Sequence, residues 1–149
     1  MEETPCAIVV PVDFSDASWA ALERAVKLAG GEAGVHVVHV LRPLSAVEPG
    51  IVWGTVNDGT RNQAAKDRLH GELQRRGHGR VAARVLFGEP SKAVADYAND
   101  KGAPLVIVSA FGHSGFLRSL LGSTAERIVR QCQCDVLVIR PPQGTSASL

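Results

Sequence analysis

Short apolar runs alternate with helical patterns along the whole chain, and this alternation limits the folds that the chain can form. The runs lie at residues 7–10, 35–41, 81–87, 105–108 and 136–139 and are rich in Val, Ile and Leu. Continuous β-branched runs are typical of strands that are buried on both faces. Because a helical segment separates each run from the next, the sequence predicts one open α/β domain with a parallel sheet covered by helices on both faces.

Turn and capping residues mark the ends of the predicted helices. Ser15 is a good N-cap for the first helix, and Gly30 ends it. Further helices are expected at about residues 60–76, 90–101 and 123–131, the second of these with Pro90 in its first turn. Residues 42–58 carry Pro, Gly and Asn without a clear period, so we expect a long and mobile connection there.

Size and charge exclude several functional classes. The chain has 149 residues, a length typical of one domain, and we expect that domain at residues 1–140 and a flexible tail at 141–149. The formal net charge of +1 gives no electrostatic footprint for binding nucleic acid or an anionic membrane. No run approaches the roughly 18 apolar residues of a membrane span. Three cysteines and an acidic amino-terminal segment without a signal-peptide pattern predict a cytoplasmic protein.

A parallel sheet of this kind binds ligands beyond the carboxyl ends of its strands, so the residues that follow each run are the candidates. Familiar motifs are absent there: the chain has no G-x-x-x-x-G-K-[ST] and no G-x-G-x-x-G after the first run. The third run ends in Phe87 rather than in the aspartate that a phosphoacceptor domain needs. Asp13 follows the first run and is either a ligand-binding acid or a solvent-exposed turn residue.

The stretch after the fourth run is the most informative one. Gly112 and Gly122 stand on either side of nine residues, and Ser123 begins the next predicted helix. Free N–H groups at a helix N-terminus suit a phosphate, and glycines let the backbone approach it closely. The alternative is that Ser123-x-x-Glu126 is a capping box and does nothing more. His113 and Arg118 of this stretch face either the phosphate or the solvent.

No metal site is expected from the remaining candidates. His36 and His39 are three residues apart on a strand, so they point to opposite faces of the sheet and cannot share a metal. Cys132 and Cys134 lack two further ligands, which favours burial of Cys134 over metal binding.

Five segments of the chain carry a resemblance to a known family. They are Ile8-Val9-Val10-Pro11-Val12-Asp13-Phe14-Ser15, Val38-His39-Val40, Gly112-x9-Gly122-Ser123, Glu126-Arg127-Ile128-Val129 and Cys134-x-Val136-Leu137-Val138-Ile139. Over nearly its whole length the chain resembles a universal stress protein, whose nucleotide signature is G-x2-G-x9-G-[ST]. Here Ser109 stands where that signature has its first glycine. The resemblance implies the strand order 3-2-1-4-5, and in this family many members dimerise and one branch binds ATP.

The resemblance also implies roles for particular residues. Asp13, with Pro11 and Val12 beside it, would meet the nucleoside, and the Val40 backbone would lie beside the adenine. Gly112, Gly122, Ser123 and Thr124 would hold the triphosphate, and Val108 and Ser109 would line the floor. Because the loop has no P-loop lysine, ATP is expected to bind together with Mg²⁺. A Cβ at Ser109 either crowds the ribose or is tolerated there.

Three functions are compatible with this resemblance. The first is an ATP-binding module that signals in the stress response by nucleotide occupancy. The second is a partner-binding dimer that holds no nucleotide, and the third is a slow ATPase. Turnover has the least support, because no Ser/His/Asp set and no paired carboxylates converge on the loop. The run at residues 135–140 is expected at a sheet edge, where it would pair antiparallel with a second copy to form a homodimer.

Overall fold

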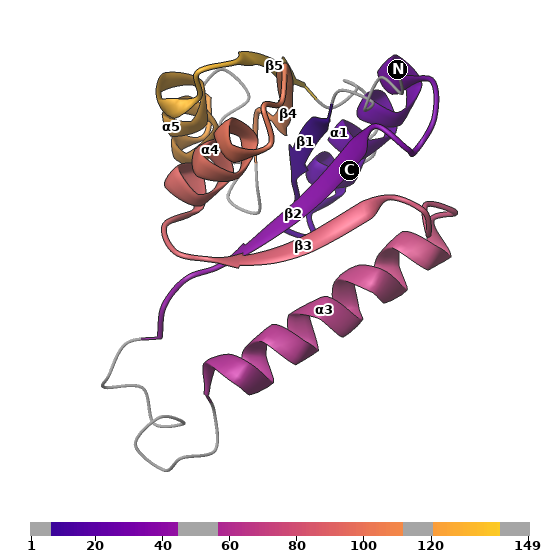
Figure 1. Cartoon of the computed structure of the whole chain (residues 1–149), viewed down its shortest axis with the longest axis vertical. Helices are drawn as coiled ribbons and strands as arrows, with labels where there is room; N and C mark the ends of the chain where they lie inside the picture. Colours follow the sequence, from indigo (N-terminus) through magenta and orange to yellow (C-terminus); the bar gives the residue numbers. More distant parts are fainter. Residues whose placement is uncertain (1–6, 45–56, 112–120, 141–149) are drawn as a thin grey trace, which may run out of the picture.

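The computed structural model describes residues 7–44, 57–111 and 121–140. They form a five-stranded sheet with all neighbours parallel, in the order β3-β2-β1-β4-β5 (Figure 1). The strands are β1 (Ile8–Pro11), β2 (Val35–Leu41), β3 (Ala82–Phe87), β4 (Leu105–Ser109) and β5 (Asp135–Ile139). The predicted fold class and strand order are therefore confirmed.

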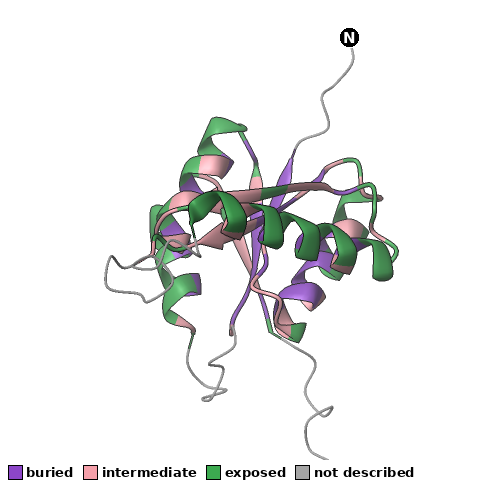
Figure 2. Cartoon of the chain, turned by 90° about the horizontal axis from the view of Figure 1, so that it is seen from below, coloured by how far each residue is buried: buried purple, intermediate pink, exposed green. Residues whose placement is uncertain are grey.

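Helices cover both faces of the sheet. They are α1 (Asp16–Ala29), α3 (Asp58–Arg75), α4 (Pro90–Asp100) and α5 (Ser123–Gln131). Successive residues of a strand point to opposite faces, so β1 supplies Val10 to the core under α1 and α3, and Val9 to the core under α4 and α5. Figure 2 shows the consequence: the central strands are buried, and the outer surface of α3 is exposed. No helix in the described part of the chain is long and apolar enough to cross a membrane.

The helix ends follow the chemistry of their caps. Ser15 caps α1 as predicted, its side chain accepting a hydrogen bond from the Ser18 N–H at 3.2 Å, and Gly30 ends the helix in the left-handed region at a φ of 71°. The predicted start of α3 at residue 60 is wrong. Asn57 caps this helix and accepts from the Thr60 N–H at 2.9 Å, so residues 57 and 58 belong to the helix and its cap rather than to the loop.

Strand ends differ from the prediction by one residue at several places. β1 begins at Ile8 and includes Pro11, because Pro11 still lies opposite Val38 in the parallel register. β4 and β5 likewise extend by one residue each, to Ser109 and from Asp135, because the two strands pair from Leu105 with Asp135 to Ser109 with Ile139. Residues 45–56 of the predicted connection and the predicted tail at 141–149 lie outside the described residues.

Candidate functional site

A pocket of about 520 Å³ lies at the carboxyl ends of the strands, where the chain order of the sheet reverses between β1 and β4. It lies on the face that α4 and α5 cover. The predicted site residues that line it are Pro11, Val12, Asp13, Val40, Val108, Ser109, Gly122, Ser123 and Thr124. The tenth predicted residue, Gly112, lies outside the described residues, as do His113 and Arg118.

Asp13 lies in a turn that is fixed by hydrogen bonds on both sides. The Val12 N–H donates to the Val38 carbonyl of β2 at 2.9 Å, and the Asp13 N–H donates to Ser18 Oγ at 3.3 Å. Asp13 Oδ1 accepts from the Ser15 N–H at 3.0 Å and from the Ser15 hydroxyl. The half-buried carboxylate is thus held at the pocket, which differs from a simple solvent-exposed turn residue.

His39 supports the same turn from β2. Its Nδ1 lies 2.8 Å from the Val12 carbonyl oxygen, and because a carbonyl can only accept, Nδ1 carries the proton. Burial lowers the pKa of His39, so the ring is neutral at physiological pH. The ring also lies against Phe14, with 4.6 Å between the centroids.

The two histidines of β2 point to opposite faces, as predicted. His36 lies on the α4 side, where its Nδ1 is 2.9 Å from the Tyr97 hydroxyl. Within residues 7–44, 57–111 and 121–140, no three His, Cys, Asp or Glu side chains form a group that could hold a metal. Cys134, which we expected to be buried, is half-buried. Partial burial of the Cys132 thiol, together with the neighbouring Cys134 thiol, raises the pKa of Cys132 to about 11.

Within the described residues, the N-terminus of α5 opens onto the pocket without a side-chain cap. The alternative of a capping box at Ser123 and Glu126 does not hold, because Gly122 is the N-cap and Ser123 is already the first helical residue. Glu126 instead accepts a hydrogen bond from Arg130 at 2.9 Å. First-turn N–H groups have no partner within their own helix, and they carry the positive end of its dipole. Gly122, Ser123 and Thr124 therefore bring an anion-binding helix end to the pocket.

Gly122 is packed closely against the backbone that follows β4. Its N–H donates to the Ala110 carbonyl at 2.8 Å, and a Cβ on Gly122 would come within 3.0 Å of the same oxygen. The Ala110 N–H in turn donates to the Ile139 carbonyl of β5 at 2.8 Å. The beginning of α5 is thereby fixed against the end of β4.

Ser109 lines the pocket where the family signature has its first glycine. It is buried, and its hydroxyl donates to the Phe111 carbonyl at 2.8 Å. The hydroxyl group is therefore engaged with the chain that follows β4.

Sequence reasoning missed several residues that line the pocket. They are Ser18, Val38, His39, Arg42, Pro90, Val94, Ala110, Ala125 and Ile128. The two-residue period of a strand could have identified part of this set, because Val38, Val40 and Arg42 alternate along one side of β2 and its extension. Among the described residues of the pocket, Arg42 is the one with a permanent positive charge.

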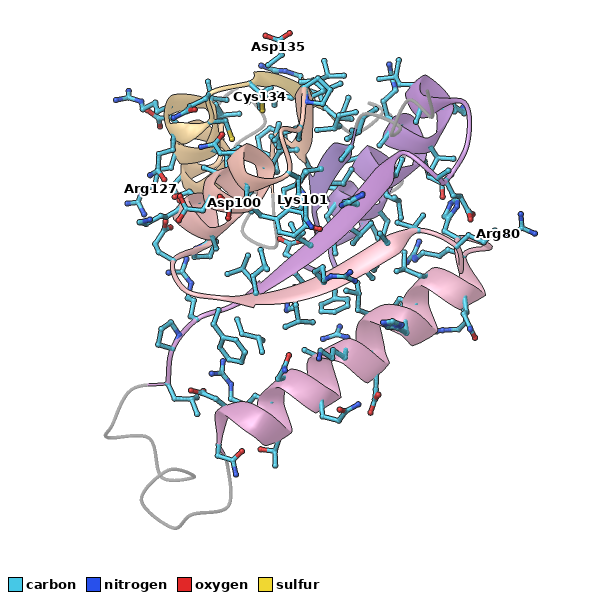
Figure 3. The ribbon with its side chains drawn as sticks, viewed as in Figure 1. Arg80, Asp100, Lys101, Arg127, Cys134 and Asp135 are labelled. Carbon is cyan, nitrogen blue, oxygen red and sulfur yellow. The ribbon has the colours of Figure 1, made fainter. Side chains whose placement is uncertain are left out.

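On its outer side, α5 carries polar groups. Arg127 points outward from α5 (Figure 3) and lies 3.8 Å from Glu89, which caps α4. This exposed ion pair joins the two helices that border the pocket, and pairs of this kind stabilise by less than about 1 kcal/mol.

Comparison with known proteins identifies the family. The model of the Universal stress protein family matches residues 7–140. Universal stress protein YxiE of Bacillus subtilis is 30% identical over 144 residues, which cover 89% of this chain and 97% of that protein. A universal stress protein of Methanocaldococcus jannaschii is 28% identical over 141 residues, which cover 91% of this chain and 82% of that protein.

The solved structures agree with this assignment. Universal stress protein UspA from Lactobacillus plantarum matches with a TM-score of 0.74 at 27% identity, covering 91% of this chain and 98% of that one. The chain belongs to the universal stress protein family.

Proposed function

We propose that this protein binds ATP together with Mg²⁺ in the pocket between β1 and β4, and that it acts in the stress response or in signalling through the occupancy of this site. The observation that carries the proposal is the convergence of three different groups on one pocket: Asp13 after the end of β1, Val40 of β2, and the N-terminus of α5.

The order of the strands suggests how the nucleotide lies. The phosphates belong at α5, which follows β4. Val40 lies on β2, two strands away from β4, which is about 10 Å at the usual strand spacing. A nucleoside spans this distance, with its base at Val40 and its ribose near Asp13, whose carboxylate can accept hydrogen bonds from sugar hydroxyls.

The walls of the pocket suit a base at that end. Val38, Val94 and Ile128 are buried apolar residues from three different elements, and together they offer an apolar enclosure. A few polar groups in an otherwise apolar cleft are typical of sites for small organic ligands.

Charge balance is the reason for Mg²⁺. A triphosphate brings several negative charges, whereas the described lining supplies Arg42 and the helix N–H groups. A bound divalent cation would neutralise the remaining charge.

Calorimetric titration of the purified full chain tests this proposal. We expect ATP to bind and its affinity to fall when a chelator removes Mg²⁺. Cyclic AMP is the informative competitor, because one structure with this fold, at 24% identity and a TM-score of 0.57, is a universal stress protein in complex with cAMP. No detectable binding at millimolar ATP would refute the proposal, and clearly tighter binding of cAMP would replace ATP as the ligand.

A further inference from the structure

We propose that Arg68 of α3 is a positioning residue for nucleotide binding: by stacking on Phe14, it holds the turn that presents Asp13 to the pocket. Arg68 itself is exposed and does not line the pocket. The binding part of this inference rests on the proposed function, whereas the effect on the turn can be measured without any ligand.

Phe14 has an unusual backbone conformation for its residue type. Its φ is 66°, in the left-handed region, and it is the one non-glycine residue with a positive φ in the described part of the chain. A bulky side chain is disfavoured in that region, so it persists only where its surroundings hold it. Phe14 lies between Asp13 and Ser15, at the bend that directs the chain from β1 into α1.

Side chains from three elements surround the Phe14 ring. The guanidinium carbon of Arg68 lies 3.9 Å from the ring centroid, within the range of a cation–π interaction. The His39 ring of β2 lies at 4.6 Å and the Trp19 ring of α1 at 6.0 Å between centroids, both tilted. Of these three side chains, Arg68 is the one from α3. This helix is far from the turn in the sequence, so Arg68 links the turn to a distant part of the chain.

The hydrogen bonds of the Asp13 side chain connect the two residues on either side of Phe14. Asp13 Oδ1 accepts from the Ser15 N–H and the Ser15 hydroxyl, so both bonds depend on the backbone angles of the residue between them. If Phe14 leaves the left-handed region, the Ser15 N–H turns away from the carboxylate. Removing the contact that keeps the Phe14 ring in place is therefore expected to release the Asp13 side chain.

Helix α3 also provides a matched control. Only Ala65, Leu69 and Leu73 of this helix are buried, so its remaining anchors are long side chains. Arg76, the C-cap residue of α3, lies two turns further along and stacks on the Trp19 ring at 4.5 Å. Arg76 holds the end of α3 to an aromatic ring as Arg68 does, but its partner Trp19 lies in α1, outside the turn. Trp19 is also the more distant of the two rings beside Phe14, at 6.0 Å between centroids.

The first experiment measures the turn in the ligand-free protein. In Arg68→Met we expect the amide resonance of Ser15 to shift and its hydrogen exchange to become about three- to fivefold faster, the effect of losing one exposed cation–π contact. Arg68→Lys should retain part of the parent behaviour, because an ammonium group can also stack on the ring. Arg76→Met should leave the Ser15 amide close to its parent position.

The second experiment measures ATP affinity on the same variants. We expect Arg68→Met to weaken binding about three- to fivefold and Arg76→Met to change it less than twofold. Equal losses in both variants would mean that a general loosening of α3 causes the effect, and the inference would be wrong. It would also be wrong if Arg68→Met left the Ser15 amide unchanged.

A double-mutant cycle separates the stack from a simple effect of charge. Asn tolerates the left-handed region, so Phe14→Asn removes the ring without adding backbone strain. In that background Arg68→Met should have no further effect on the Ser15 amide or on affinity, and additive losses would overturn the inference. If the parent itself does not bind ATP, the proposed function fails, and the amide measurements still decide the role of Arg68.

Discussion

At the scale of single residues, Gly122 is the position where a side chain should do the most damage to the site. A Cβ there meets the Ala110 carbonyl oxygen at 3.0 Å, and this oxygen already accepts from the Gly122 N–H. We expect Gly122→Val to weaken ATP binding by more than about tenfold and to lower the thermal midpoint by a few degrees, because it moves the start of α5.

Calorimetry and thermal denaturation check this prediction. Gly71→Ala is the matched control, since a Cβ at Gly71 of α3 meets nothing within 4 Å and Ala favours a helix. Unchanged ATP affinity in a folded Gly122→Val protein would mean that the phosphates do not approach α5.

At the scale of elements, His78 connects the loop after α3 to α1 and to the loop after α1. Its Nε2 lies 2.7 Å from Glu23 and its Nδ1 lies 3.1 Å from Glu32. Burial opposes the charged ring, but the hydrogen bonds and charges of the two carboxylates outweigh it and raise the pKa of His78 above 6.5. A pKa that is raised in the folded state adds stability below 6.5, and this stability is lost as the pH rises through the folded pKa.

The test is urea denaturation of the parent and of His78→Gln at pH 6 and at pH 8. We expect the parent to exceed the variant in unfolding free energy by about 1 kcal/mol at pH 6 and by less at pH 8. His70→Gln, a change at an exposed histidine of α3, is the control. A difference that stays constant or grows toward pH 8 would contradict this account of His78.

The elements and the strand-end residues of the site could be predicted from sequence, because both depend on local patterns. Apolar periodicity identified the strands, and the residues after β1 and β4 follow from the rule for parallel sheets. The contacts that hold the site could not be predicted in this way. Arg68 and Phe14 are far apart in the sequence and meet only through the packing of α3. The left-handed φ of Phe14 has no signal in the residues around it.

At the scale of the whole molecule, β3 and β5 form the edges of the sheet in the described part of the chain, and β5 is the edge that we expect a second copy to cover. Residues 136–138 are apolar and only half-buried, and β5 contains no proline or lysine that would discourage pairing. Val129 of α5, the helix that precedes β5, is a further exposed apolar residue, at 44%. At the start of the strand, Asp135 points away from the molecule (Figure 3). We therefore predict a two-fold dimer in which the two β5 strands pair antiparallel.

The hydrogen-bond pattern identifies the residue that tests this dimer. The Ile139 carbonyl accepts from the Ala110 N–H, which follows β4, so Ile139 directs its backbone groups inward, toward the β4 side of the strand. Since backbone groups alternate along a strand, Leu137 also faces β4, whereas Val138 faces the open edge. Val138→Pro thus removes an outward donor and spares the hydrogen bonds to β4, whereas Leu137→Pro would damage the fold itself.

Sedimentation should show the parent at twice 15.8 kDa, Val138→Pro as a monomer, and Val138→Thr, which keeps its N–H, as a dimer. A parent that is monomeric at micromolar concentration would show that β5 does not form this interface.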